Sequence, residues 1–162
     1  MASEYVLRIP LERHIIKTRR PFVAVIEEIR DIVGSSKAGS GPTSVGRSRR
    51  RVDGPPAPSK LVVLGELDIE RASARDCDVG RLLRLLVDMP AATEELVRFL
   101  PEVGAYCPVT ILVQQSADGG TRLVYDTLAS AISACEDEQS VVVARGLDAE
   151  VLALLRHVAA GD

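Results

Sequence analysis

The chain has 162 residues, a formal net charge of −3 and a hydrophobic content of 46%, which together predict one folded domain spanning residues 1–162. Aromatic residues make up only 3% of the sequence, so the core is expected to be aliphatic. This scarcity argues against an aromatic platform for stacking bases or sugars. The acidic balance likewise argues against nucleic acids and anionic membranes as partners.

The three cysteines, Cys77, Cys107 and Cys135, form no CxxC pair and have no histidine at zinc-ligand spacing. Their odd number suits a reducing compartment. The first residues lack a secretory signal pattern, and no apolar run approaches the roughly 20 residues of a membrane helix. We therefore expect a cytoplasmic protein with no membrane span, no metal and no cofactor.

Apolar periodicity predicts the secondary structure of the first third of the chain. Residues 13–18 are β-prone, and Pro21 is expected at the first position of a helix with apolar residues at helical spacing. Gly34 is the expected end of that helix. Residues 35–59 are rich in Gly, Ser, Pro and Arg and predict a mobile loop.

The rest of the chain predicts strands over 61–68 and 81–87, then a helix capped by Asp88 with Pro90 in its first turn. The strongest hairpin signal joins strands 108–115 and 121–127 through an Asp-Gly-Gly turn. A short helix or turn over 128–135 and a last helix capped by Asp148 follow. The order β-α-loop-β-β-α-β-β-α, with its hairpin, predicts an α+β fold with a mixed or antiparallel sheet.

Several short stretches carry a resemblance. Val103-Gly104-Ala105-Tyr106-Cys107-Pro108 leads into the hairpin, Arg13–Thr18 is followed by Arg20-Pro21-Phe22, and Leu64-Gly65-Glu66-Leu67-Asp68 forms a strand. Together these stretches resemble the family called domain of unknown function 302. The resemblance implies a small two-layer α+β sandwich, often dimeric, and no established reaction. With strand edges that need covering, it leads us to expect a homodimer.

The chain departs from that family at two positions. Ile69 stands where relatives often place a histidine, and Asp88-Met89-Pro90 stands where they often carry Gly-Asn-Pro. A metal or acid–base role resting on those positions is therefore not expected here.

Glu66 and Asp68 are the first candidate catalytic residues. Positions i and i+2 of a strand share a face, which alternation also assigns to Val62 and Leu64, opposite Val63. Neighbouring carboxylates have divergent pKa values, so one of the pair donates a proton and the other accepts it. The alternative is a hydrated strand end.

His14 is the third catalytic candidate, as a general base, or else a sheet residue with one hydrogen-bond partner. Tyr106, Tyr125 and Arg71 are the ligand-binding candidates, although both tyrosines also suit amphipathic packing. Cys107 is expected to be buried and structural. The arginines between Arg47 and Arg51 suit either an anion or a solvated charge cluster.

Two functions follow from these residues. The first is a protein that binds a small apolar or anionic molecule, with a cofactor-free isomerase, cyclase or lyase reaction carried by the carboxylates. The second is a non-catalytic module that forms a homodimer through its sheet. A pocket that contains both carboxylates favours the first, and a large apolar interface favours the second.

Overall fold

The structure, a computed structural model, describes residues 4–33, 61–69, 80–135 and 137–161. The predicted loop 35–59, the predicted helix end at Gly34 and the candidate Arg71 lie outside these residues. The described strands are β1 (Arg13–Thr18), β2 (Val62–Asp68), β3 (Leu82–Asp88), β4 (Val109–Gln115) and β5 (Thr121–Asp126). They form one sheet in the order β1-β5-β4-β3-β2, and every neighbouring pair is antiparallel.

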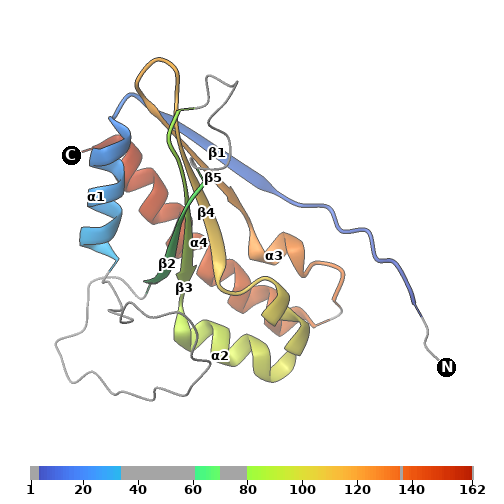
Figure 1. Cartoon of the computed structure of the whole chain (residues 1–162). Helices are drawn as coiled ribbons and strands as arrows, with labels where there is room; N and C mark the ends of the chain where they lie inside the picture. The colour runs from blue at the N-terminus through green and yellow to red at the C-terminus, as the bar shows by residue number, and fades with distance from the viewer. Residues whose placement is uncertain (1–3, 34–60, 70–79, 136, 162) are drawn as a thin grey trace, which may run out of the picture.

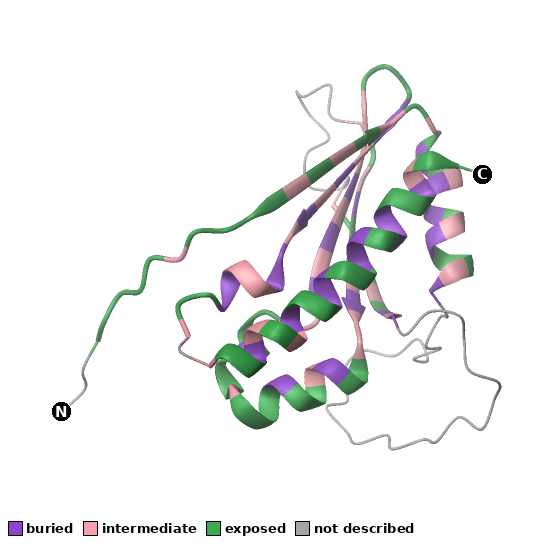
Figure 2. Cartoon of the chain, turned by 180° about the vertical axis from the view of Figure 1, so that it is seen from behind, coloured by how far each residue is buried: buried purple, intermediate pink, exposed green. Residues whose placement is uncertain are grey.

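Helices lie on one side of this sheet (Figures 1 and 2). The longest, α4, crosses the back of the sheet with α1 beside it, and α2 packs against α4. A 3-10 helix, η2, and the short α3 complete the described elements. Their bounds are α1 (Phe22–Ile32), α2 (Pro90–Phe99), η2 (Pro101–Ala105), α3 (Leu128–Ala131) and α4 (Glu138–Ala160). The predicted α+β class and the two-layer arrangement are confirmed.

The core lies between the sheet and the helices because the central strands alternate strictly. Ile111 and Leu123 are completely buried toward the helices, whereas Leu112 and Val124 lie on the opposite face and are only partly buried. We call that opposite face the open face, since no described helix covers it. The apolar stripe expected on the first helix is confirmed, with every member at most 5% exposed: Phe22, Val25, Ile26, Ile29 and Val33.

The predicted start of the last helix at Asp148 was wrong. Helix α4 begins ten residues earlier, at Glu138, where the Asp137 carboxylate accepts a hydrogen bond from the Ser140 backbone N–H at 3.0 Å. Asp148 resembles a cap in sequence because it precedes an apolar run. In the structure it is a buried mid-helix residue whose carboxylate binds groups on other elements.

The predicted cap at Asp88 was also wrong. The residue at the N-cap of α2 is Met89, and the Asp88 carboxylate accepts a hydrogen bond from the Thr93 hydroxyl at 2.6 Å. Pro90 does occupy the first turn, as predicted, and α2 ends before Pro101.

A β-bulge in β2 changes which residues share a face. The pairing with β3 shifts at Leu64, so that Val63 lies opposite Val87 and Glu66 lies opposite Leu85. Both partners are buried beneath the helices, and therefore Val63 and Glu66 lie on the same, helix-covered side. The predicted grouping of Glu66 with Leu64 and Val62, opposite Val63, was wrong because the inserted residue reverses the alternation.

Candidate functional site

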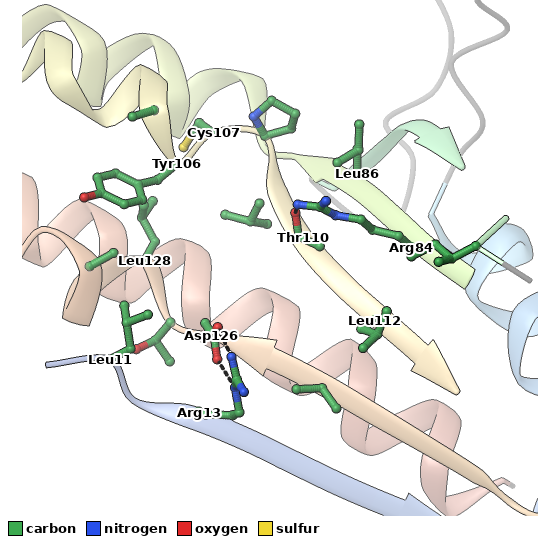
Figure 3. Close-up of a pocket in the computed structure, with 17 residues that line it drawn as sticks. Leu11, Arg13, Arg84, Leu86, Tyr106, Cys107, Thr110, Leu112, Asp126 and Leu128 are labelled. Atoms are coloured by element: carbon green, nitrogen blue, oxygen red, sulfur yellow. Dashed lines mark hydrogen bonds and ion pairs between the residues drawn. The ribbon is translucent and has the colours of Figure 1, made fainter. Parts of the chain in front are cut away.

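The open face contains a pocket of about 680 Å³, which we call the sheet-face groove (Figure 3). Leu86, Leu112 and Val124 from β3, β4 and β5 form its apolar floor. At the end where β4 begins, Tyr106 and Leu128 form its wall. Its volume lies within the range of small-molecule sites, and its combination of apolar floor and few polar groups is typical of them.

Arg84 is the central cationic group of the groove. It follows Leu82 and Leu83 in a strand whose one other charged residue is Asp88 at its end, and its position in the alternation places it on the open face. Its guanidinium Nη2 donates to the Thr110 hydroxyl at 3.3 Å. Among the residues that the structure describes, Arg84 has no ion-pair partner. The charge is therefore free to meet an anionic group entering the groove.

A second arginine at the groove is already neutralised. Arg13 and Asp126 lie directly opposite each other on β1 and β5, and Nε and Nη2 of the arginine donate to the two carboxylate oxygens at 2.6 and 2.8 Å. These hydrogen bonds hold the pKa of the Asp126 carboxyl below its usual value. Asp126 is therefore ionised at neutral pH and serves as a fixed polar edge of the groove.

Glu66 and Asp68 line a different and smaller pocket of about 280 Å³, between α1 and the edge of the sheet. Arg30 and Arg81 line it too, and the Arg81 guanidinium lies 4.9 Å from the centroid of the Phe22 ring. We call it the carboxylate pocket. Both carboxylates line the same pocket, and this arrangement favours a ligand site beside them.

The charge state of Glu66 is set by Arg30, however. The Arg30 guanidinium donates to both carboxylate oxygens of Glu66, with Nε 2.8 Å from Oε1. This pairing lowers the pKa of Glu66, and it raises the pKa of Arg30. A carboxyl with a lowered pKa is ionised near neutrality, so Glu66 is poorly suited to donate a proton there.

The structure does not bring His14 to the carboxylates. His14 lies on β1 and Glu66 on β2, which are opposite edges of the sheet. Four strand spacings of about 4.8 Å separate them by roughly 19 Å. The His14 ring forms a hydrogen bond with the Glu12 carboxylate, Nε2 to Oε1 at 2.8 Å. A single acid–base site containing all three predicted catalytic residues is therefore not formed within the described chain.

The two tyrosine candidates also lie apart. Tyr106 is 37% exposed and lines the sheet-face groove, as a ligand-binding role requires. Tyr125 is completely buried toward the helices, and its hydroxyl donates to Asp148 Oδ1 at 2.6 Å. Burial raises the pKa of Tyr125 far above its usual value. Tyr125 is therefore a core residue and does not face the groove.

The family profile described as "Domain of unknown function DUF302" matches residues 42–158. The chain belongs to this family. It is also similar to a solved structure, that of an uncharacterized conserved protein DUF302 from Bacillus stearothermophilus, with a TM-score of 0.67. That likeness covers 89% of this chain and 95% of the other at 13% sequence identity, which supports the fold. No curated protein matches the chain.

In this DUF302 chain, Ile69 lies at the groove, where it adds one more aliphatic side chain. Cys107, which was expected to be buried, is half-buried at the same groove, and this partial burial raises the pKa of its thiol. Within the described residues, no group of three or more His, Cys, Asp or Glu side chains is arranged to hold a metal ion. None of the described helices is long and apolar enough to cross a membrane.

Sequence reasoning singled out Tyr106 at the groove of this DUF302 domain but missed Arg84 and Thr110. The Arg84 guanidinium donates to the Thr110 hydroxyl within the groove, yet neither residue was among the predicted site residues. The available signal was one arginine inside the run Leu82-Leu83-Arg84-Leu85-Leu86. A charged residue in such a run marks the position of the strand that faces away from the core.

Replacing Glu66 with Gln should cost stability at neutral pH by roughly 0.2–1 kcal/mol, the usual range for a solvent-accessible ion pair. The pKa of Glu66 is lower in the folded state than in the unfolded state, where it is about 4.3. The ion pair therefore stabilises the fold fully above the unfolded pKa. That stabilisation is lost as the pH falls through the folded pKa. Denaturant unfolding at pH 7 and pH 3 should therefore show a difference between wild type and Glu66→Gln that shrinks in acid. A difference that grows in acid would contradict this account of the Arg30–Glu66 pair.

Proposed function

We propose that this DUF302 domain is a small-molecule-binding protein whose ligand lies in the sheet-face groove. The observation that supports this most strongly is Arg84, an arginine with a hydroxyl partner but no carboxylate partner among the described residues, placed above an apolar floor. An apolar surface with a few convergent polar groups is the usual composition of a ligand site. Tyr106 and Thr110 add hydroxyl groups at the same groove.

The sequence also suggested that the carboxylate pocket carries out a cofactor-free acid–base reaction. The shared pocket of Glu66 and Asp68 supports it, and the pairing of Glu66 with Arg30 counts against it. His14, the third residue of that hypothesis, lies at the other edge of the sheet. We therefore propose binding as the function and assign no reaction.

N-Phenyl-1-naphthylamine, a neutral dye that fluoresces in apolar sites, is a suitable first probe of the groove. We expect wild type to bind it and Leu112→Trp to weaken binding at least tenfold, or about 1.4 kcal/mol, because the indole fills space above the floor. Val142→Trp is the matched control, since Val142 is 59% exposed on α4, on the helix side of the sheet. Equal dye binding by the two variants would contradict a ligand site in the groove.

The competing proposal is a homodimer that covers the open face. It is supported by exposed apolar side chains on that side of the molecule, Ile15 at 46% and Leu67 at 50%, and by Tyr5 at 88% in the N-terminal arm. Light scattering on the same samples distinguishes the two proposals. A wild-type dimer that Leu112→Trp converts to a monomer, without dye binding by either form, would favour the interface over the ligand site.

A further inference from the structure

The open face is positively charged although the whole chain is acidic. Strand alternation and register place four cations on this face, and the chain carries a formal net charge of −3. Two carboxylates from the same strands, Asp88 and Asp126, accompany them. The four cations are Arg13, Lys17, Arg84 and Arg122.

Three of these cations have no carboxylate partner in the described part of the chain. Asp126 is paired with Arg13, and the Asp88 carboxylate binds the Thr93 hydroxyl. Lys17 and Arg122 lie directly opposite each other on β1 and β5, an arrangement of like charges that destabilises a sheet. Counting only the described residues, the cations of the open face therefore outnumber its carboxylates.

Arg122 also has a nitrogen atom that lacks a hydrogen-bond partner among the described residues. This atom, Nε, is shielded from solvent. A shielded donor without a partner is unfavourable, and cations without counter-charges attract anions toward the surface that presents them. Arg122 does not line the groove itself, so its effect on a ligand there acts through the field.

Arg84 is the cation that a ligand in the groove would meet directly. The register places it beside Leu112 on β4, and Leu67 on β2 lies on its other side. Figure 3 shows its guanidinium extending toward Thr110. Guanidinium and hydroxyl donors that lie this close together match the two oxygens of one carboxylate. The apolar floor beginning at Leu112 then receives the remainder of the molecule.

We infer that the ligand is an amphipathic carboxylic acid, with its carboxylate bound by Arg84 and Thr110 and its apolar body lying over Leu86, Leu112 and Val124. This inference rests on the proposed ligand site and specifies its substrate class. Lys17 and Arg122 increase the rate at which such an anion reaches the groove. The fixed Arg13–Asp126 pair bounds the same groove. It offers little further attraction for a carboxylate, because its charges already neutralise each other.

Displacement of N-phenyl-1-naphthylamine by decanoate and by 1-decanol tests the inference, since the two competitors share a chain length and differ in charge. Wild type should bind decanoate at least tenfold more tightly than decanol. Arg84→Gln should abolish most of that preference, measured within the variant as the ratio of the decanoate and decanol displacement constants. Arg122→Gln should reduce the preference slightly and make it less sensitive to salt. Arg98→Gln is the matched control, because it removes the same charge from the surface of α2.

The outcomes separate this inference from the proposed function. Dye binding that is insensitive to Leu112→Trp would remove the ligand site itself. Groove-dependent dye binding with equal displacement by decanoate and decanol would keep the ligand site and overturn the carboxylate class. A preference for decanoate that Arg84→Gln and Arg98→Gln reduce equally would show that net charge, and not the Arg84–Thr110 arrangement, selects the anion.

Discussion

Replacing Asp148 with Ala is expected to destabilise the protein by about 3 kcal/mol, because it leaves three donors without their acceptor. Asp148 is 5% exposed, and its Oδ1 accepts from the Tyr125 hydroxyl at 2.6 Å and from the Leu128 backbone N–H at 2.8 Å. Its Oδ2 accepts from the Ala129 backbone N–H at 2.9 Å. One carboxylate thus joins α4 to β5 and to the start of α3.

Thermal unfolding measures this effect directly. For a chain of this length, a loss of that size lowers the melting temperature by roughly 6–12 °C. Tyr125→Phe should cost less, about 1 kcal/mol, because the two backbone donors keep their acceptor. Glu150→Ala is the matched control, an exposed acidic residue in the same helix, and should change stability by less than about 0.5 kcal/mol. A loss for Asp148→Ala no larger than for Glu150→Ala would contradict the role assigned to this carboxylate.

Ile111→Ala is expected to cost about 2–5 kcal/mol, whereas Leu112→Ala, one residue further on, should cost about 1 kcal/mol. Ile111 is completely buried between the sheet and the helices, so its truncation leaves a cavity. Leu112 lies on the open face, where solvent reaches the vacated space. The adjacent pair compares the two faces of one strand.

Denaturant unfolding and dye binding should respond in opposite ways to these two changes. Ile111→Ala should reduce the free energy of unfolding while the folded protein still binds N-phenyl-1-naphthylamine. Leu112→Ala should retain most of the stability but weaken dye binding, because the dye loses contact with the floor of the groove. A larger stability loss at Leu112 than at Ile111 would show that the open face is covered in solution.

Local sequence patterns correctly predicted the helices and strands that are specified by their own residues. The hairpin of β4 and β5 follows from two β-prone runs around an Asp-Gly-Gly turn, and it forms as expected. Helix α1 follows from apolar residues at helical spacing, all of which are buried. In both cases the residues that specify the element lie within it, so no knowledge of distant partners is required.

The errors arise where a distant partner decides the outcome. Asp148 precedes an apolar run as a cap does, but its carboxylate is satisfied by β5 and α3, which no local pattern reveals. The bulge at Leu64 reverses the faces of the residues after it, and Glu66 pairs with Arg30 of α1 as a result. The sheet-face groove depends on strand order, since Arg84 and Val124 meet only because β3, β4 and β5 are neighbours.

The strand order also constrains when the sheet can be completed during synthesis. Among the described strands, β1 comes first in sequence and pairs only with β5, and its residue Arg13 meets Asp126 across 113 positions of sequence. A ribosome adds residues in order, so β1 has no strand to join until most of the polypeptide has been made. Ile16 of β1 packs against the finished core, whose members all follow it in the sequence. Pairings at such long separation are formed slowly, because closing a long loop is entropically costly. The edge of this sheet that is translated first is thus the edge that is assembled last, and for that interval an unpaired β-strand is exposed to other nascent chains.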